Sequence, residues 1–185
     1  MSENRTFEPR KFAVVGAGPV GCIVAAFLSK GGYEVALCDV VPELLEPAAK
    51  RGIIIEGAET LQQTVARTCL SVDELADVKP DVIFITVKAN ALPLIASAIE
   101  EFHRPEMMLV SWQNGIDTEL ELARPLGRES VLRAVVNYGC GLKAPAHVVM
   151  PFHHPPHSIQ ELEAPAAGAA KAIAKVLSGC GLQTT

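Results

Sequence analysis

The amino-acid sequence predicts an α/β fold in which helices cover both faces of a doubly wound, mostly parallel sheet, with a short β-rich insertion. Short apolar runs typical of buried strands alternate with helical stretches along most of the chain. The first run leads directly into the loop Gly16-Ala17-Gly18-Pro19-Val20-Gly21, and the second ends in an acidic residue, Asp39. This order of strand, GxGxxG loop, helix and acid-terminated strand is typical of a Rossmann-type dinucleotide-binding domain.

The first βαβ unit lies near the N-terminus. We expect a flexible leader over residues 1–10 and one dinucleotide-binding domain over residues 11–185. The predicted unit consists of a strand at Lys11–Val15, a helix at Cys22–Lys30 and a second strand at Glu34–Asp39. Its length is close to the roughly 30 residues typical of such units.

The remaining elements follow from the same patterns. A short helix is expected at Pro42–Arg51, where Pro47 should cause a kink or a late start. The β-rich runs Gly52–Glu56 and Thr64–Cys69 flank polar turn residues and predict a hairpin. Further strands are predicted at Asp81–Val87, Met107–Trp112, Val131–Val136, His147–Met150 and Ser158–Gln160. Further helices are predicted at Val72–Val78, Leu92–Phe102, Thr118–Ala123 and Ala166–Leu177.

Composition and charge argue against several classes of protein. The formal net charge of −5 is the opposite of the basic footprint of nucleic-acid-binding proteins. The first residues contain no apolar signal region, and the apolar stretches fall well short of the roughly 20 residues that span a membrane. The five cysteines are scattered and form no CxxC pair, which favours reduced thiols over a disulfide framework. We therefore expect a cytoplasmic protein that binds neither nucleic acid nor a membrane.

The glycine loop has the spacing required to hold a pyrophosphate. Gly16 allows the tight turn, Gly18 lets the backbone approach the phosphates, and Gly21 allows close packing of helix on strand. The helix N-terminus adds free N–H groups and partial positive charge. The alternative is a glycine-rich turn that only joins a strand to a helix.

Asp39 indicates which dinucleotide the loop would bind. It follows Gly21 by 18 residues, and a carboxylate about 20 residues after the loop accepts hydrogen bonds from ribose hydroxyls. The same charge would repel a 2′-phosphate, so the sequence favours NAD over NADP. The alternative role for Asp39 is an N-cap for the helix that begins at Pro42. These residues do not separate NAD from FAD, which binds to the same kind of loop.

Two further strands run into polar residues at the predicted ligand-binding edge. Lys88 follows the strand Asp81–Val87, and Asn114 follows the strand Met107–Trp112. Because parallel strands joined by right-handed crossovers end at one edge of the sheet, both residues should lie near the bound ligand. A cation and an amide there can polarise a carbonyl or hold a carboxylate. The alternatives are a surface lysine and an Asn-Gly turn.

Taken together, these motifs resemble the ketopantoate reductases (2-dehydropantoate 2-reductases). The resemblance rests on the N-terminal GxGxxG loop, on TVKA at Thr86–Ala89 and on QNG at Gln113–Gly115. It extends over the β-hairpin insertion, the glycine-containing segment Val131–Gly141 and the closing GCGL at Gly179–Leu182.

The resemblance implies a Rossmann domain followed by a helical domain, with the active site between them. Such enzymes reduce ketopantoate or another 2-oxo acid with NADPH or NADH, in the first case for pantothenate biosynthesis. By resemblance, Lys88 and Asn114 line the nicotinamide and substrate site, and Cys140 contacts the cofactor through its backbone. The principal catalytic lysine and carboxylate would belong to the helical domain, with the lysine protonating the substrate oxygen. We therefore expect the chain by itself to bind dinucleotide without catalysing reduction.

The sequence departs from the family pattern in two places. The family commonly uses NADP and has a basic residue after the second strand, where this chain has Asp39-Val40. The family also tends to have a glycine-rich turn between its last β-runs. In this chain the corresponding segment is rich in proline and contains the histidines His153, His154 and His157.

Neither the histidines nor Cys140 forms a recognisable catalytic or metal-binding motif. Histidines this close in sequence can share a metal ion, but no cysteine or carboxylate lies at a familiar ligand spacing, so we predict no metal site. A solvated loop, or a surface that faces the second domain, is the expected structure around His153, His154 and His157. Cys140 lies between two glycines with no visible base, which favours a small buried thiol over a nucleophile.

Three functions are consistent with these observations. The first is the cofactor domain of an NAD(P)-dependent 2-oxo-acid reductase with a preference for NAD. The second is part of an FAD-dependent oxidoreductase, and the third is a non-catalytic dinucleotide-sensing module. Apolar surface exposed where a second domain docks would favour self-association, so we also expect a homodimer.

Overall fold

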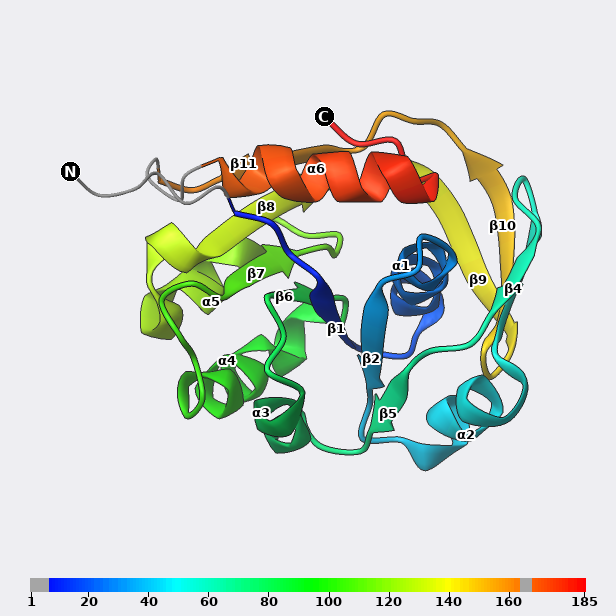
Figure 1. The fold of residues 1–185 in the computed structure, drawn as a ribbon, viewed down its shortest axis with the longest axis horizontal. Helices are drawn as coiled ribbons and strands as arrows, with labels where there is room; N and C mark the ends of the chain where they lie inside the picture. Colours follow the sequence, from blue (N-terminus) through cyan, green and yellow to red (C-terminus); the bar gives the residue numbers. More distant parts are fainter. Residues whose placement is uncertain (1–6, 164–167) are drawn as a thin grey trace.

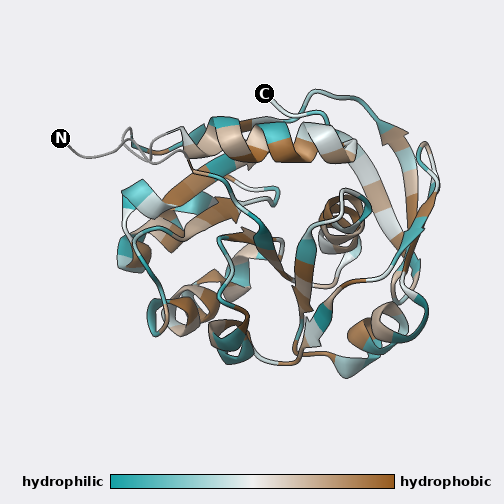
Figure 2. Ribbon diagram, in the orientation of Figure 1, coloured by the Kyte–Doolittle hydropathy of each residue, from teal (hydrophilic) through white to brown (hydrophobic). Residues whose placement is uncertain are grey.

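The computed structural model describes residues 7–163 and 168–185, and one helix lies at its centre. This helix, α1 (Pro19–Lys30), is enclosed between a seven-stranded and a four-stranded sheet (Figure 1). All its residues from Gly21 to Leu28 are buried, and Figure 2 shows that it is hydrophobic around its whole circumference. A helix that is apolar on every side needs cover on every side, and the two sheets and helix α6 supply it.

The seven-stranded sheet has the order β11-β8-β7-β6-β1-β2-β5. Its strands are β1 (Lys11–Val15), β2 (Glu34–Cys38), β5 (Arg67–Cys69), β6 (Val82–Ile85), β7 (Met108–Ser111), β8 (Val131–Val135) and β11 (Ser158–Glu161). All neighbours are parallel except β11, which runs antiparallel to β8. The chain builds outward from β1 to β2 and β5, and then returns to place β6 on the other side of β1. Open α/β sheets bind ligands in the crevice at the carboxyl ends of the strands where the strand order reverses in this way.

Helices cover both faces of this sheet. They are α2 (Pro42–Arg51), α3 (Leu75–Val78), α4 (Leu92–Glu100), α5 (Thr118–Leu126) and α6 (Ala169–Cys180), besides α1. Short 3₁₀ turns occur at η1 (Val72–Glu74), η2 (Ala89–Ala91) and η3 (Arg128–Ser130). Along β1, Phe12 and Val14 belong to the core shared with α1 and α6, whereas Ala13 and Val15 belong to the core beneath α4 and α5. The two-residue period of a strand accounts for this alternation.

The second sheet has the order β4-β3-β10-β9 and corrects one prediction. Its strands are β3 (Ile53–Gly57), β4 (Leu61–Gln63), β9 (Tyr138–Ala144) and β10 (His147–His153). The predicted hairpin exists, but β3 pairs with β4 and not with the run Thr64–Cys69. The turn after Gly57 (φ +116°) brings β4 back at once, and the chain then crosses to the first sheet, where β5 pairs with β2 and Cys69 is buried.

The other predicted elements agree with the structure within a few residues, with three differences. Strand β9 was not predicted, because its sequence contains two glycines and several exposed residues. Helix α6 begins at Ala169, and residues 166–167 of the predicted helix lie outside the described residues. Within the predicted leader, Phe7 packs against the core and the Arg10 N–H donates to Asp81, so this part is attached to the domain; residues 1–6 lie outside the described residues. In the described parts of the chain, no helix is both long and apolar enough to cross a membrane.

Candidate dinucleotide-binding site

Two of the three glycines in the loop after β1 are packed against the protein, and the third is not. A Cβ atom added to Gly21 would lie 1.8 Å from the Gly16 carbonyl oxygen, and one added to Gly16 (φ +110°) would lie 2.7 Å from Thr86 Oγ1. A Cβ on Gly18 would meet no atom within 4 Å. A simple turn requires glycine at positions 16 and 21, but it does not require glycine at position 18. The free space above Gly18 is what a ligand that approaches the backbone needs.

The N-terminus of α1 fits a bound phosphate. The N–H groups of Gly18, Val20 and Gly21 donate to no acceptor among the described residues, and Pro19 occupies the first helical turn. No acidic residue lies in that turn, and no side chain caps it. Unpaired amides and the positive end of the helix dipole therefore face the same place.

Asp39 follows β2 and is bound to the glycine loop. Its Oδ2 accepts a hydrogen bond from the Ala17 N–H at 2.7 Å, and its Oδ1 accepts one from the Val41 N–H at 3.0 Å. The N-cap of α2 is Val41, and no side chain caps that helix, so the alternative role of Asp39 as an N-cap is wrong. A carboxylate has about four acceptor positions, so Asp39 can still accept hydrogen bonds from a ligand.

Thr86 is a site residue that sequence reasoning missed. Its Oγ1 lies 2.9 Å from the Val15 carbonyl oxygen and 3.0 Å from that of Gly16, so its single hydroxyl proton is donated to the start of the glycine loop. Its backbone N–H also donates to Val15. Thr86 belongs to the TVKA motif, in which Lys88 supplies the charge. A hydroxyl at the end of an apolar strand is the signal that would have identified it.

Lys88 and Asn114 come to the same edge of the sheet. Ile85 of β6 pairs with Ser111 of β7, and each polar residue lies three positions beyond its strand. Both are exposed, and neither side chain has a hydrogen-bond or ion-pair partner within the described residues. Next to Asn114, the side-chain amide of Gln113 is buried with its nitrogen and oxygen unpaired in this part of the chain. The exposed side chains of Lys88 and Asn114 are thus available to a ligand at this edge.

Cys140 lies on β9 of the second sheet, beside α1. It is half-buried, and burial raises its pKa. Nearby, Cys22 of α1 donates through Sγ to the Ala17 carbonyl oxygen, and its pKa is raised to about 12 by burial and, to a smaller extent, by Asp39 and Cys140. Neither thiol is activated as a nucleophile, since reactive thiols have a lowered pKa.

The structure corrects the expectation of a solvated loop for two of the three histidines. His157 is completely buried, and the His153 side chain is 6% exposed, whereas His154 is exposed and contacts Phe152. The reason is that β10 continues to His153 and β11 begins at Ser158, so His153 and His157 lie next to strand ends that pack on the core, whereas residues 154–156 between them are exposed. The His157 ring packs edge-on against the rings of Trp112 and Tyr138. No group of three metal-binding side chains occurs among the residues that the structure describes.

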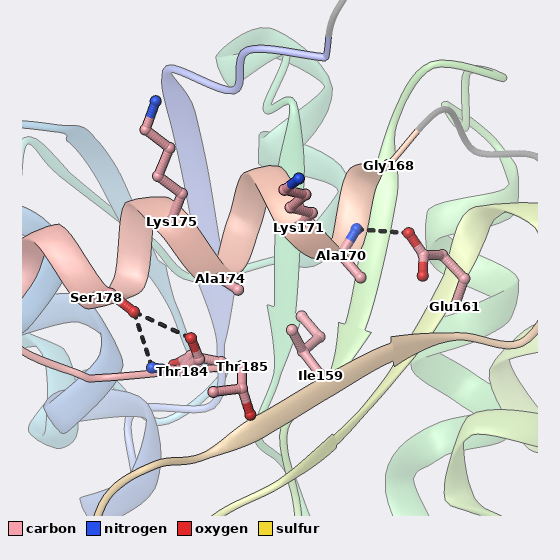
Figure 3. A pocket seen from close by; sticks show the side chains of 10 residues that line it. All are labelled: Ile159, Glu161, Gly168, Ala170, Lys171, Ala174, Lys175, Ser178, Thr184 and Thr185. Atoms are coloured by element: carbon pink, nitrogen blue, oxygen red, sulfur yellow. Dashed lines mark hydrogen bonds between the residues drawn. The ribbon is translucent and has the colours of Figure 1, made fainter.

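A groove of about 510 Å³ lies elsewhere, between α6 and β11 (Figure 3). It contains none of the predicted site residues. Its lining consists of Ile159, Glu161, Gly168, Ala170, Lys171, Ala174, Lys175, Ser178, Thr184 and Thr185. Glu161 is already used there, since its Oε1 accepts a hydrogen bond from the Ala170 N–H.

The role of Thr86 can be tested by an isosteric substitution. Thr86→Val keeps the shape but removes the hydroxyl, which loosens the glycine loop, and we expect about 5-fold weaker binding of NADH because one hydrogen bond contributes about 1 kcal/mol. Thr86→Ser keeps the hydroxyl and should bind within about 2-fold of the original chain. Fluorescence titration measures both affinities. Wild-type affinity in Thr86→Val would contradict this role.

Burial of His157 predicts a stability that depends on pH. Burial, and secondarily His153, lowers the pKa of His157 to about 4, so the neutral ring is favoured in the folded state. The unfolded chain binds the proton near its ordinary pKa of about 6.5, so this stabilisation is complete above that pH. It should be lost progressively, by about 3 kcal/mol in total, as the pH falls from about 6.5 to about 4.

Urea unfolding at a series of pH values measures this loss. The exposed His154→Asn should keep the pH dependence, and His157→Asn should reduce it. An unfolding free energy whose pH dependence is the same in His157→Asn as in the original chain would refute the assignment to His157.

Comparison with known proteins agrees with this architecture. The family model described as Ketopantoate reductase PanE/ApbA matches residues 12–161. No curated protein sequence matches the chain. The structure is similar to that of 2-dehydropantoate 2-reductase from Porphyromonas gingivalis W83, with a TM-score of 0.84 and 17% identity over 96% of this chain and 64% of that chain.

Two further solved structures are similar. D-mandelate dehydrogenase with NADH and anilino(oxo)acetate gives a TM-score of 0.82 and 23% identity over 95% of this chain and 56% of that one. 2-Dehydropantoate 2-reductase from Methylococcus capsulatus gives a TM-score of 0.79 and 21% identity over 95% of this chain and 56% of that one. The chain thus spans little more than half the length of most of these proteins. The family match covers most of the chain, and the sheet order and glycine loop agree with it: this chain belongs to the ketopantoate reductase PanE/ApbA family.

Proposed function

We propose that this chain is the cofactor-binding domain of an NAD(P)-dependent reductase of ketopantoate or a related 2-oxo acid, with a preference for NAD. The observation that carries the proposal is the loop after β1, where the space above Gly18 and the unpaired amides of Gly18, Val20 and Gly21 lie together. This arrangement suits a pyrophosphate, and Asp39 stands next to it through its bond to Ala17.

The end of β2 supports the preference for NAD. The remaining acceptor positions of Asp39 suit the ribose hydroxyls, and its charge disfavours a 2′-phosphate. The residue after it is Val40, which is 72% exposed and offers no cation to such a phosphate. Val40, Val41 and Leu70 are exposed apolar side chains just beyond β2 and β5, and they would suit the flat face of the adenine.

Lys88 and Asn114 would serve the nicotinamide end of the site. When bound, the nicotinamide supplies or accepts a hydride. The Lys88 ammonium would hold the carboxylate or polarise the carbonyl of a 2-oxo acid, and the Asn114 amide would orient the same group. The backbone of Cys140 would contact the cofactor from β9. Membership of the family favours a nicotinamide dinucleotide over FAD, and the D-mandelate dehydrogenase relative was solved with NADH.

The surface around the nicotinamide end also supports an association with further protein. Leu94 and Ile116, which lie beyond β6 and β7, are 75% and 89% exposed. Exposed apolar side chains next to a site favour the docking of a second domain or of a second copy of the chain. We therefore propose that the chain forms a homodimer. We also propose that it is located in the cytoplasm.

The preference between dinucleotides is the first test. We expect NADH to bind at least about 10-fold tighter than NADPH, because Asp39 repels the 2′-phosphate. Asp39→Asn removes the charge but keeps an acceptor for Ala17, and it should reduce this ratio several-fold. Asp77→Asn, an exposed acid on α3, is the charge-matched control and should keep the ratio. Equal or tighter binding of NADPH by the original chain would show the assignment of Asp39 to be wrong, and flavin absorbance of the purified protein would favour an FAD enzyme.

Turnover is the second test. By family resemblance the proton-donating lysine belongs to a second domain, so the 185-residue chain should bind NADH but should not oxidise it in the presence of ketopantoate. The absorbance of NADH over time measures the reaction, with fluorescence titration on the same sample to establish that the cofactor is bound. Steady ketopantoate-dependent oxidation would contradict the expectation and show that this chain holds a complete catalytic site.

A further inference from the structure

Three hydrogen bonds join the connection between β8 and β9 to the segment His153–His157. The Asn137 N–H donates to Nδ1 of His157 at 3.0 Å, and the Asn137 Nδ2 donates to the Pro156 carbonyl oxygen at 2.6 Å. The His154 N–H donates to the Asn137 carbonyl oxygen at 2.8 Å. One of these two segments leaves the first sheet for the second, and the other returns. Both meet at the carboxyl end of β8, since Ser158 pairs with Val135.

The hydrogen bond from Asn137 determines the protonation of a chain of buried groups. Since Nδ1 of His157 accepts a hydrogen bond from the Asn137 N–H, the ring proton of neutral His157 is on Nε2. Nε2 of His157 lies 3.2 Å from Nε2 of His153, which must then accept. The His153 proton is therefore on Nδ1, 3.0 Å from Oε1 of Glu59 in the β3–β4 turn. Every ring nitrogen is paired, and neither Nε2 has a lone pair left for a metal ion.

The surroundings favour the neutral form of His157, because burial lowers its pKa. Trp112 and Tyr138 pack edge-on against His157, and the Trp112 Nε1–H donates to the Tyr138 hydroxyl at 3.0 Å. Glu59 and Tyr138 are the titratable side chains that contact the two rings, and burial raises the pKa of Tyr138, which keeps its phenol neutral. Trp112 directly precedes Gln113 and Asn114 at the ligand-binding edge. His157 thus contacts Trp112 in the loop after β7 and Asn137 in the loop after β8, and both loops lie at the ligand-binding edge.

We propose that His157 is a positioning residue of the dinucleotide site, which holds the Val136–Asn137 connection at the ligand-binding edge through its Nδ1 acceptor. The proposal rests on the function proposed above. His153 and Glu59 keep His157 in the tautomer that can accept the Asn137 N–H. A ring that only filled space would be replaced without loss by an apolar side chain, whereas a positioning residue requires the acceptor.

Two substitutions of similar volume separate these roles. Asn places an oxygen close to the position of His Nδ1, and Leu has the same shape without an acceptor. We expect His157→Asn to bind NADH within about 2-fold of the original chain and His157→Leu to bind about 5-fold more weakly, because the hydrogen bond lost in His157→Leu contributes about 1 kcal/mol. Stability alone should rank them in the opposite order, because Leu is the better core residue. His154→Asn is the matched control on the exposed neighbour and should bind as the original chain does.

Nuclear magnetic resonance of the original chain gives a readout that does not depend on the variants folding. Long-range ¹⁵N–¹H correlation spectra near neutral pH should show the proton of His157 on Nε2 and that of His153 on Nδ1. The proton of His157 on Nδ1, or equal NADH affinity of folded His157→Leu and the original chain, would overturn the proposal. An original chain that shows the expected tautomers but binds neither NADH nor NADPH contradicts the proposed function, and with it the positioning role. An original chain that binds NADH and is unaffected by His157→Leu contradicts the positioning role alone.

Discussion

The close approach of α1 to the end of β1 is the contact on which the rest of the structure depends. Gly21 brings the helix so near that any side chain there would overlap the Gly16 carbonyl oxygen. The helix that starts in this position is apolar on all sides, so the first sheet covers only part of it. The second sheet, built from β3, β4, β9 and β10, and helix α6 cover the rest. The same helix thus offers its N-terminus to a phosphate and requires an additional layer along its length.

A second sheet obliges the chain to cross between layers, and the crossings carry polar groups into the interior. Buried polar groups are costly unless they are hydrogen-bonded. The buried His157 meets this requirement by accepting a hydrogen bond from the Asn137 N–H, at the point where two crossings run side by side. Thr86 does the same at the start of the glycine loop, where its hydroxyl pairs with carbonyl oxygens of Val15 and Gly16. His157 and Thr86 thus support the site by forming the hydrogen bonds that the crossing between sheets and the tight glycine turn require.

The features that sequence predicted are those with a local cause. The spacing of the glycines, the acid at the end of β2 and the alternation of apolar runs require no knowledge of distant residues, and the structure has each of them in place. The pairing of β5 with β2, the strand β9 and the burial of His153 and His157 depend on contacts between segments far apart in the chain. Residues 153–157, with three histidines and two prolines, have the composition of a loop, and only the packing of Trp112 and Tyr138 against His157 shows that part of this segment reaches the core.

The two ends of the site differ in how completely this chain builds them. At the pyrophosphate end, Asp39 and Thr86 hold the loop through hydrogen bonds that exist without a ligand. At the proposed nicotinamide end, Lys88 and Asn114 are exposed and have no partner among the described residues, so nothing in this part of the chain orients their side chains. Preorganised groups bind without the entropic cost of ordering, and catalysis depends on such groups at the reacting atoms. The affinity for dinucleotide should therefore reside in this chain, whereas the orientation of Lys88 and Asn114 must come from the bound ligand or from protein that packs over Leu94 and Ile116.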